Sequence, residues 1–133
     1  MNTFIFSIII GWSLFVEHPK DISGKWLVES VDASTAEAGM SAKQKAMAEK
    51  MLVQPFTHST FDFKPDHHFY LSANISQMPK DNFWEYKPAE GEISIREYKD
   101  KKALIMQLSI VEKGDDLYFL MHETGIVLKV KRI

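Results

Sequence analysis

The stretch Ala103-Leu-Ile-Met-Gln-Leu-Ser-Ile-Val111, followed by Lys113-Gly-Asp-Asp116 and Leu117-Tyr-Phe-Leu-Met-His122, decides the fold. Apolar side chains recur at every second residue in both halves, which is the period of a β-strand with one buried face. The Gly-Asp turn between the halves is typical of a β-hairpin. We therefore expect two antiparallel strands that bury these side chains on one face: Leu104, Met106, Leu108, Ile110, Leu117, Phe119 and Met121.

The same period continues through most of the chain and predicts eight short strands. The first lies at Gly24–Asp32, and the others follow at 57–64, 68–73, 83–87, 92–96, 103–111, 117–122 and 126–133. Short antiparallel strands with one apolar face must close on themselves to bury that face and remove exposed edges. The sequence therefore predicts an all-β, eight-stranded, antiparallel up-and-down barrel with one helix between its first two strands.

The helix is expected within Val31 to Pro55, with Pro55 ending it. Ser41 and Gln44 have the spacing of a capping box, and good helix formers follow them. The chain also places Met40, Met47 and Met51 on one side of this helix. This stripe is either an adaptable lid over an apolar barrel mouth or the surface by which the helix packs on the barrel.

Composition limits the classes of function. The 133 residues are enough for one domain, and 45% hydrophobic with 26% charged residues is ordinary for a globular chain. A formal net charge of −2 and the lack of a Lys/Arg cluster give no reason to expect a nucleic-acid partner. The chain has no cysteine, which excludes disulfides, thiolate nucleophiles and Cys-ligated zinc.

The first sixteen residues differ from the rest because they carry no charged side chain. The apolar run Phe4–Val16 is shorter than the roughly 20 residues of a transmembrane helix, but it matches the apolar region of a secretory signal. We therefore predict a signal peptide at 1–16, a barrel domain at 17–133, export to the periplasm or the extracellular space, and no membrane span in the mature form. The alternative is a buried first strand, since Ile8-Ile9-Ile10 is β-branched.

Several motifs occur in the order found in a known family. Ile22-Ser-Gly24-Lys-Trp26 resembles the Gly-x-Trp signature of lipocalins and their calycin relatives. Phe61-Asp-Phe63-Lys-Pro-Asp66-His67, then Trp84-Glu-Tyr86, then the apolar hairpins from Leu104 to Phe119 are similar to the small bacterial lipocalin-like domains. The resemblance covers residues 22–133 and implies the same barrel.

The resemblance also implies roles for particular residues. In lipocalins the signature Trp packs under a basic residue near the C-terminus, so Trp26 and Arg132 are expected to close one end of the barrel. Arg132 shares its strand phase with Leu128 and Val130, so it can face inward. His67 stands where the family favours Gly, and we expect a strained turn there.

The candidate ligand site combines inward-facing side chains with the methionine stripe. It would be an apolar pocket with the Tyr86 hydroxyl as its polar group. Its members are Phe61, Phe63, Phe69, Trp84, Tyr86, Met106, Phe119, Met121, Met47 and Met51. The competing interpretation is a plain packed core, because an eight-stranded barrel has little spare volume.

No pattern indicates catalysis or a metal site. His67 and His68 are adjacent and so diverge on a strand, while His58 and His122 lie on the outward phase. The chain has no Gly-x-Ser-x-Gly motif. Three acidic residues are expected to lie on the solvent face: Asp62, Glu85 and Glu92. We expect no enzyme, no metal and no cofactor.

These observations predict an exported, monomeric, non-catalytic protein that holds a small apolar ligand in its barrel. The alternative is an interaction module, such as a protease inhibitor or envelope partner, with a solid barrel core and binding loops.

Overall fold

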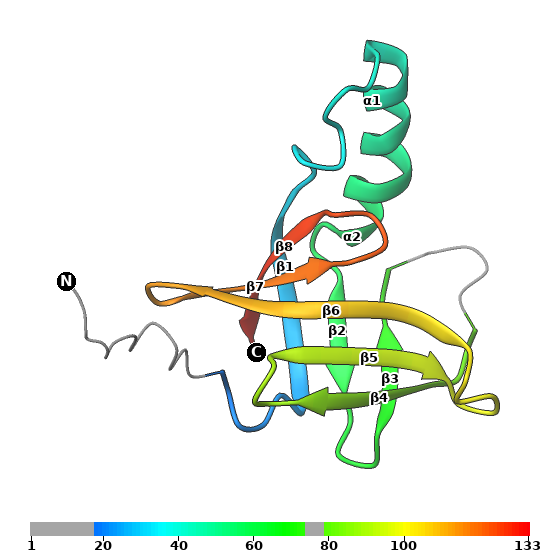
Figure 1. Cartoon of the computed structure of the whole chain (residues 1–133), viewed down its shortest axis with the longest axis vertical. Helices are drawn as coiled ribbons and strands as arrows, with labels where there is room; N and C mark the ends of the chain where they lie inside the picture. The colour runs from blue at the N-terminus through cyan, green and yellow to red at the C-terminus, as the bar shows by residue number, and fades with distance from the viewer. Residues whose placement is uncertain (1–17, 74–78) are drawn as a thin grey trace.

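The computed structural model describes residues 18–73 and 79–133. Eight antiparallel strands close into a barrel in chain order, with β1 paired to β8, which confirms the predicted fold (Figure 1). The predicted signal peptide at 1–16 lies outside the described residues. The strands are β1 (Gly24–Asp32), β2 (Thr60–Phe63), β3 (His68–Leu71), β4 (Asn82–Lys87), β5 (Glu92–Glu97), β6 (Leu104–Lys113), β7 (Asp116–Met121) and β8 (Val127–Arg132).

The two-residue alternation sets which side chains point into the barrel. Phe61 and Phe63 are buried, whereas Asp62 between them is only half-buried on the outer side. Leu104 is an exception, because we expected it on the buried face with Met106 and the structure leaves it exposed. The β5–β6 register shifts there, so that Ile95 pairs with Met106 but Arg96 pairs with Leu104. A register shift moves a side chain off its expected face, and alternation alone does not predict one.

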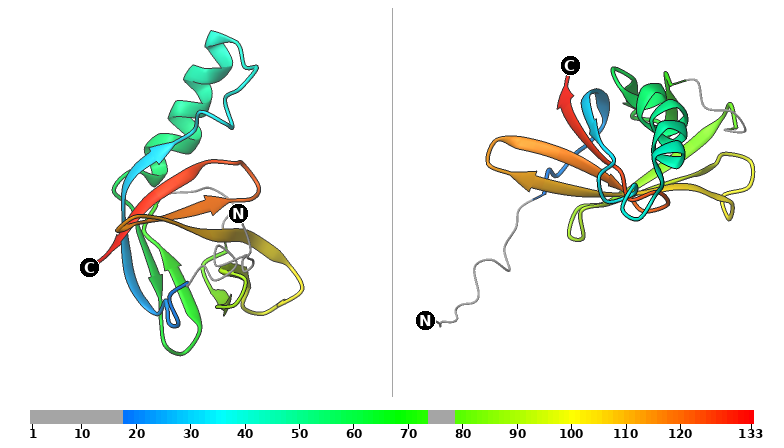
Figure 2. Two further views of the ribbon diagram at one scale, coloured as in Figure 1. Left: turned by 60° about the vertical axis from the view of Figure 1, so that its left-hand side comes forward. Right: turned by 90° about the horizontal axis from the view of Figure 1, so that it is seen from above.

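The connection between β1 and β2 carries a helical arm, defined here as α1 (Ala42–Ala48), the π-helical turn η2 (Glu49–Val53) and α2 (Gln54–Phe56). The arm projects away from the barrel (Figures 1 and 2). The predicted capping box is present at its start. The Gln44 N–H donates to Ser41 Oγ at 3.2 Å, and the Ser41 N–H donates to Gln44 Oε1 at 2.9 Å.

Pro55 does not end the helix, so that prediction is wrong. Helical structure continues to Phe56, and Thr57 ends it in an extended conformation. Proline lacks an N–H and collides with the carbonyl four residues earlier in a regular α-helix. Here the turn before Pro55 is π-helical, with the Gln54 N–H donating to Glu49 O, five residues back. This irregular turn accommodates the proline without breaking the helix.

His67 and His58 both adopt the left-handed conformation that favours glycine, with φ of 73° and 64°. The strain expected at His67 is therefore present. Its ring stacks on Phe83 with centroids 5.4 Å apart, and its Nδ1 lies 3.0 Å from the carbonyl oxygen of Trp84. These contacts hold a side chain where the backbone alone would favour none.

Candidate functional site

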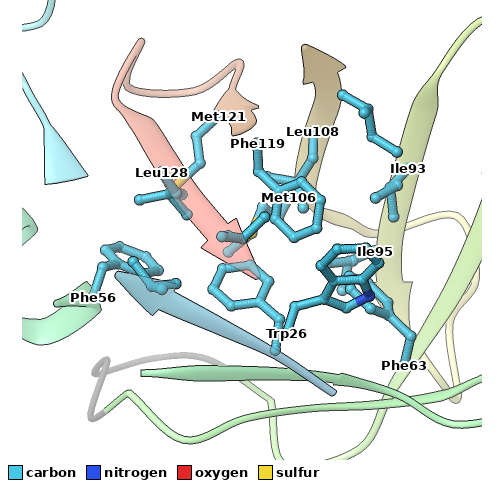
Figure 3. Close-up of a cluster of buried hydrophobic side chains, with 14 of the residues drawn as sticks. Trp26, Phe56, Phe63, Ile93, Ile95, Met106, Leu108, Phe119, Met121 and Leu128 are labelled. Atoms are coloured by element: carbon cyan, nitrogen blue, oxygen red, sulfur yellow. The ribbon is translucent and has the colours of Figure 1, made fainter. Parts of the chain in front are cut away.

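Seven of the ten predicted ligand residues lie in the interior of the barrel, and all seven are buried: Phe61, Phe63, Phe69, Trp84, Met106, Phe119 and Met121. Figure 3 shows four of them, Phe63, Met106, Phe119 and Met121, within the cluster of buried apolar side chains. The four phenylalanines among them have no exposed surface at all. A void large enough for a water molecule would itself expose the side chains around it. The four phenylalanine rings are therefore packed against protein on every side.

The rings also meet across the barrel. Phe119 on β7 lies 5.7 Å from Phe61 and 6.1 Å from Phe63, both on β2, between ring centroids. It also lies 5.8 Å from Trp26 on β1. Neither β1 nor β2 is a neighbour of β7 in the sheet. These contacts therefore span the lumen, and at this level aromatic rings fill it.

Tyr86, the predicted polar group of the pocket, lies half-buried on β4. Its hydroxyl donates to the backbone carbonyl oxygen of Pro19, in the segment before β1. Burial raises the pKa of the phenol, and the nearby charge of Glu112 raises it further. The hydroxyl therefore stays protonated near neutral pH, and this bond occupies its one hydrogen.

The two predicted lid residues are not brought to the lumen. Met47 and Met51 lie on the arm, with 56% and 65% of their surface exposed. That is more exposure than a closed lid or a docked helix would leave them. Met47 and Met51 therefore face solvent in this structure, whereas Met40, the third residue of the stripe, is half-buried. Within α1 only Ala48 is buried.

Sequence reasoning missed the residue that joins the arm to the barrel. Phe56 is buried, and its ring centroid lies 6.2 Å from that of Phe61 in the barrel interior. The Ser59 hydroxyl donates to the Phe56 carbonyl oxygen at 2.6 Å and fixes the turn that follows. An aromatic residue directly before the strand predicted at 57–64 was the available signal. The arm is thus attached at its base, where Val53 also packs against the core.

Trp26 and Arg132 face each other in the β1–β8 register. The Arg132 guanidinium carbon lies 4.3 Å from the centroid of the Trp26 ring, which is a cation–π contact. Arg132 Nη2 donates to the Asp21 carbonyl oxygen at 2.9 Å, and Nη1 donates to that of Ser23. A Cβ at Gly24 would lie only 3.2 Å from Nη1, and Gly24 has a φ of 115°. This end of the barrel, the closed end, therefore needs glycine, tryptophan and arginine together.

One outer-wall pair has the composition of a nucleophile and a base. Ser109 Oγ lies 2.6 Å from His122 Nε2 in an exposed position. Within residues 18–73 and 79–133, no carboxylate hydrogen-bonds to His122 Nδ1, so nothing there orients the ring as a catalytic base requires. In the same part of the chain, no three His, Asp or Glu side chains are grouped to hold a metal ion.

Among the described residues, no helix has the length and apolar character needed to cross a membrane. Comparisons with protein-family models, with curated proteins and with solved structures find no match to this chain. The barrel topology therefore rests on the strand pairing itself, and the resemblance to lipocalin-like domains stays a prediction.

Proposed function

We propose that this protein is a non-catalytic interaction module, in which the barrel is a solid scaffold and the arm binds a partner protein. The observation that carries the proposal is the exposure of Met47 and Met51 on a helix that projects from the barrel. Large exposed apolar side chains on a projecting element are a common mark of an interaction site.

The packed interior supports this proposal over a ligand in the lumen. A small molecule would have to displace rings that contact one another across the barrel, such as Phe119 and Phe63. Opening a comparable space in a core costs about 3–5 kcal/mol when a phenylalanine is removed. The apolar-ligand hypothesis stays a prediction, and it requires a rearrangement that the interaction hypothesis does not.

The arm has the geometry of a helix that docks in a groove. Met47 and Met51 are four residues apart and so lie on the same face of the helix. Unbranched thioether side chains adapt to irregular apolar surfaces. Full burial of a methionine contributes about 1.5–3 kcal/mol, so covering the exposed half of both contributes about 2 kcal/mol. That corresponds to roughly thirtyfold in affinity.

The charge of the arm indicates the character of the partner. Lys43, Lys45 and Lys50 are exposed around the methionines, and Glu49 is the only acidic residue of the arm. The chain as a whole has a formal net charge of −2, so the arm is locally basic on an acidic protein. We therefore infer that the partner presents an apolar groove with carboxylates at its rim.

Site-specific photo-crosslinking in the native cell tests the proposal. A photoreactive residue replaces Met51 in one variant and Lys87, at the end of β4, in a control variant. The expected result is a discrete protein adduct from position 51 that the control does not form. The captured protein, once purified, should bind the wild-type chain and should bind the Met47→Lys/Met51→Lys variant at least tenfold more weakly.

Three outcomes would overturn the proposal. Equal adducts from both positions would mean that the arm is not a preferred surface. Equal affinity of the wild type and the double variant would mean that the methionines are not anchors. Adducts with lipid instead of protein, together with flotation on anionic vesicles, would mean that the arm binds a membrane surface. A Lys45→Ala variant is the control for charge. Removing this one lysine should weaken binding of the partner only about twofold, whereas loss of both methionines should weaken it at least tenfold.

We also propose that the protein acts outside the cytoplasm. The charge-free apolar run Phe4–Val16 supports this proposal. N-terminal sequencing of the protein from its native cell should find a first residue after position 16. Recovery of intact chain beginning at Met1 in the soluble cytoplasmic fraction would contradict export without affecting the proposal for the arm.

A further inference from the structure

The outer wall of the barrel is hollowed over β6, β7, β8 and β1. The strand register places two rows of outward side chains next to each other there. Their positions alternate with the buried Phe119 and Leu128, so they point away from the core. The concave space is about 300 Å³. We call it the outer groove, and it is lined by Ser30, Asp32, Val111, Lys113, Tyr118, Leu120, Val127 and Lys129.

The floor of the outer groove is apolar, which is unusual for the solvent side of a small barrel. Val111, Tyr118, Leu120 and Val127 come from three adjacent strands and are all half-buried. Tyr118 pairs with Val111, and Leu120 pairs with Val127, so the four side chains are contiguous. None of these four side chains belongs to the buried core cluster, which is packed without them.

The rim of the outer groove carries amines that can meet an anion. Lys113 is exposed, and Lys129 Nζ lies 3.9 Å from Asp116, at the limit of an ion pair. The one carboxylate in the lining, Asp32, accepts a hydrogen bond from the Ser34 N–H at 2.9 Å. Hydrogen bonds from the side chain and from the N–H of Ser34 lower the pKa of Asp32, so this carboxylate is charged at neutral pH. The lining therefore carries two amines against one carboxylate, and its rim is net positive.

We propose that the outer groove binds a small molecule with a compact apolar body and one carboxylate. The apolar floor takes the body, and Lys113 and Lys129 take the carboxylate. The volume is about twice the roughly 150 Å³ that holds one benzene in an engineered protein cavity. A bicyclic aromatic acid or a medium-chain fatty acid has the corresponding size.

Charge argues against a second copy of this chain as the occupant. The arm, its most exposed apolar element, is surrounded by Lys43, Lys45 and Lys50. Docking the arm in the outer groove would bring these lysines to a rim that already carries Lys113 and Lys129. Like charges at close range oppose such a contact. A small anion is attracted by Lys113 and Lys129, which outnumber the one carboxylate of the lining, Asp32.

Titration with 2-naphthoate, followed by NMR of the full chain, tests the proposal. Saturable one-to-one binding is expected, with the largest shifts at the methyl groups of Val111, Leu120 and Val127. The neutral 2-naphthamide should bind about fivefold more weakly, and the cationic 2-naphthylmethylamine more weakly still. Equal binding of the three compounds, or shifts confined to other residues, would overturn the proposal.

Substitutions then locate the site. Lys113→Gln and Lys129→Gln should each weaken 2-naphthoate binding about two- to fivefold, whereas Lys87→Gln should leave it unchanged. Leu120→Glu should abolish binding, with thermal unfolding checked in parallel. Unchanged affinity in both lysine variants would overturn the proposal. The Met47→Lys/Met51→Lys variant should bind 2-naphthoate like the wild type, so this site and the proposed role of the arm can fail separately.

Discussion

The barrel interior and the arm use apolar side chains in opposite ways. In the interior, Phe119 contacts both Phe61 and Phe63 across the lumen, and the three side chains have no exposed surface. On the arm, Met47 and Met51 keep more than half of their surface in contact with solvent. The first set contributes to the free energy of folding. The second set buries less than half of its surface, so it contributes less to the free energy of folding.

This contrast predicts that substitutions in the two regions act on different properties of the molecule. A substitution in the interior should change the free energy of unfolding, and a substitution on the arm should not. The joint between the two regions is Phe56, which packs on Phe61 at the base of the arm.

Phe119→Ala should have the largest effect. It removes a ring that contacts three others from non-adjacent strands and should reduce the free energy of unfolding by about 3–5 kcal/mol. Urea denaturation measures the loss, and Met51→Ala is the matched control on the arm. A loss below about 1 kcal/mol would show that the interior is not packed as described.

The same variant separates a filled lumen from a ligand pocket. Phe119→Ala leaves an apolar cavity, and such cavities take up small apolar molecules. We expect an environment-sensitive apolar dye to bind this variant with saturation and to show no saturable binding inside the wild-type barrel. If the dye binds the wild type and 2-naphthoate displaces it, then the dye occupies the outer groove and not the lumen. Saturable one-to-one binding within the wild-type lumen would restore the apolar-ligand hypothesis.

Arg132→Ala tests the closed end. The variant loses the contact with Trp26 and two hydrogen bonds to backbone carbonyls. This loss should lower the free energy of unfolding by about 1–2 kcal/mol. Trp26→Ala should cost more, and a double-mutant cycle should show coupling of about 0.5–2 kcal/mol. Lys131→Ala, one residue away and exposed, is the control. Additive effects would mean that the Arg132–Trp26 contact contributes nothing.

Lowering the pH should affect stability differently through two aspartates, Asp21 before β1 and Asp32 at the end of β1. The Asp21 carboxylate accepts hydrogen bonds from the Ser23 N–H and hydroxyl, and Arg132 lies nearby, so the Asp21 pKa is below its ordinary value of 3.8. Asp32 has a similar turn with Ser34 but no such arginine. A lowered pKa stabilises the fold above pH 3.8, and this contribution is lost as the pH falls below that value.

The measurement is the unfolding free energy between pH 5 and pH 2. Asp21→Asn should flatten its pH dependence more than Asp32→Asn does, because Asp21 alone also interacts with Arg132. Identical curves for the two variants would mean that the arginine does not contribute.

Met47→Lys and Met51→Lys should have the smallest effect on stability. Both side chains are mostly exposed, so each variant should stay within about 0.5 kcal/mol of the wild type in urea denaturation. A loss above about 2 kcal/mol would show that the methionines pack on the protein in solution. In that case the lid or docking interpretation of the stripe would replace the exposed arm.

Local sequence features predicted much of this architecture. The alternation in 103–122 placed Met106, Leu108 and Phe119 on the buried face, and the structure confirms it. Ser41 and Gln44 marked the start of the helix. Pro55 and Leu104 were predicted wrongly, because a π-helical turn and a register shift depend on the neighbouring structure. Neither irregularity has a reliable pattern within a few residues.

Strand alternation alone was enough to predict most of the inward-facing side chains, because a strand turns successive residues to opposite sides. Whether those side chains leave a cavity depended on distances between strands that are not neighbours, such as β2 and β7, and only the tertiary structure decides these. The same holds for the outer groove, which forms only where Tyr118 and Leu120 of β7 meet Val111 of β6 and Val127 of β8. An apolar helix face likewise says nothing about whether its partner lies in the same chain. The barrel surrounds its own apolar face, whereas the arm extends beyond it and leaves Met47 and Met51 uncovered.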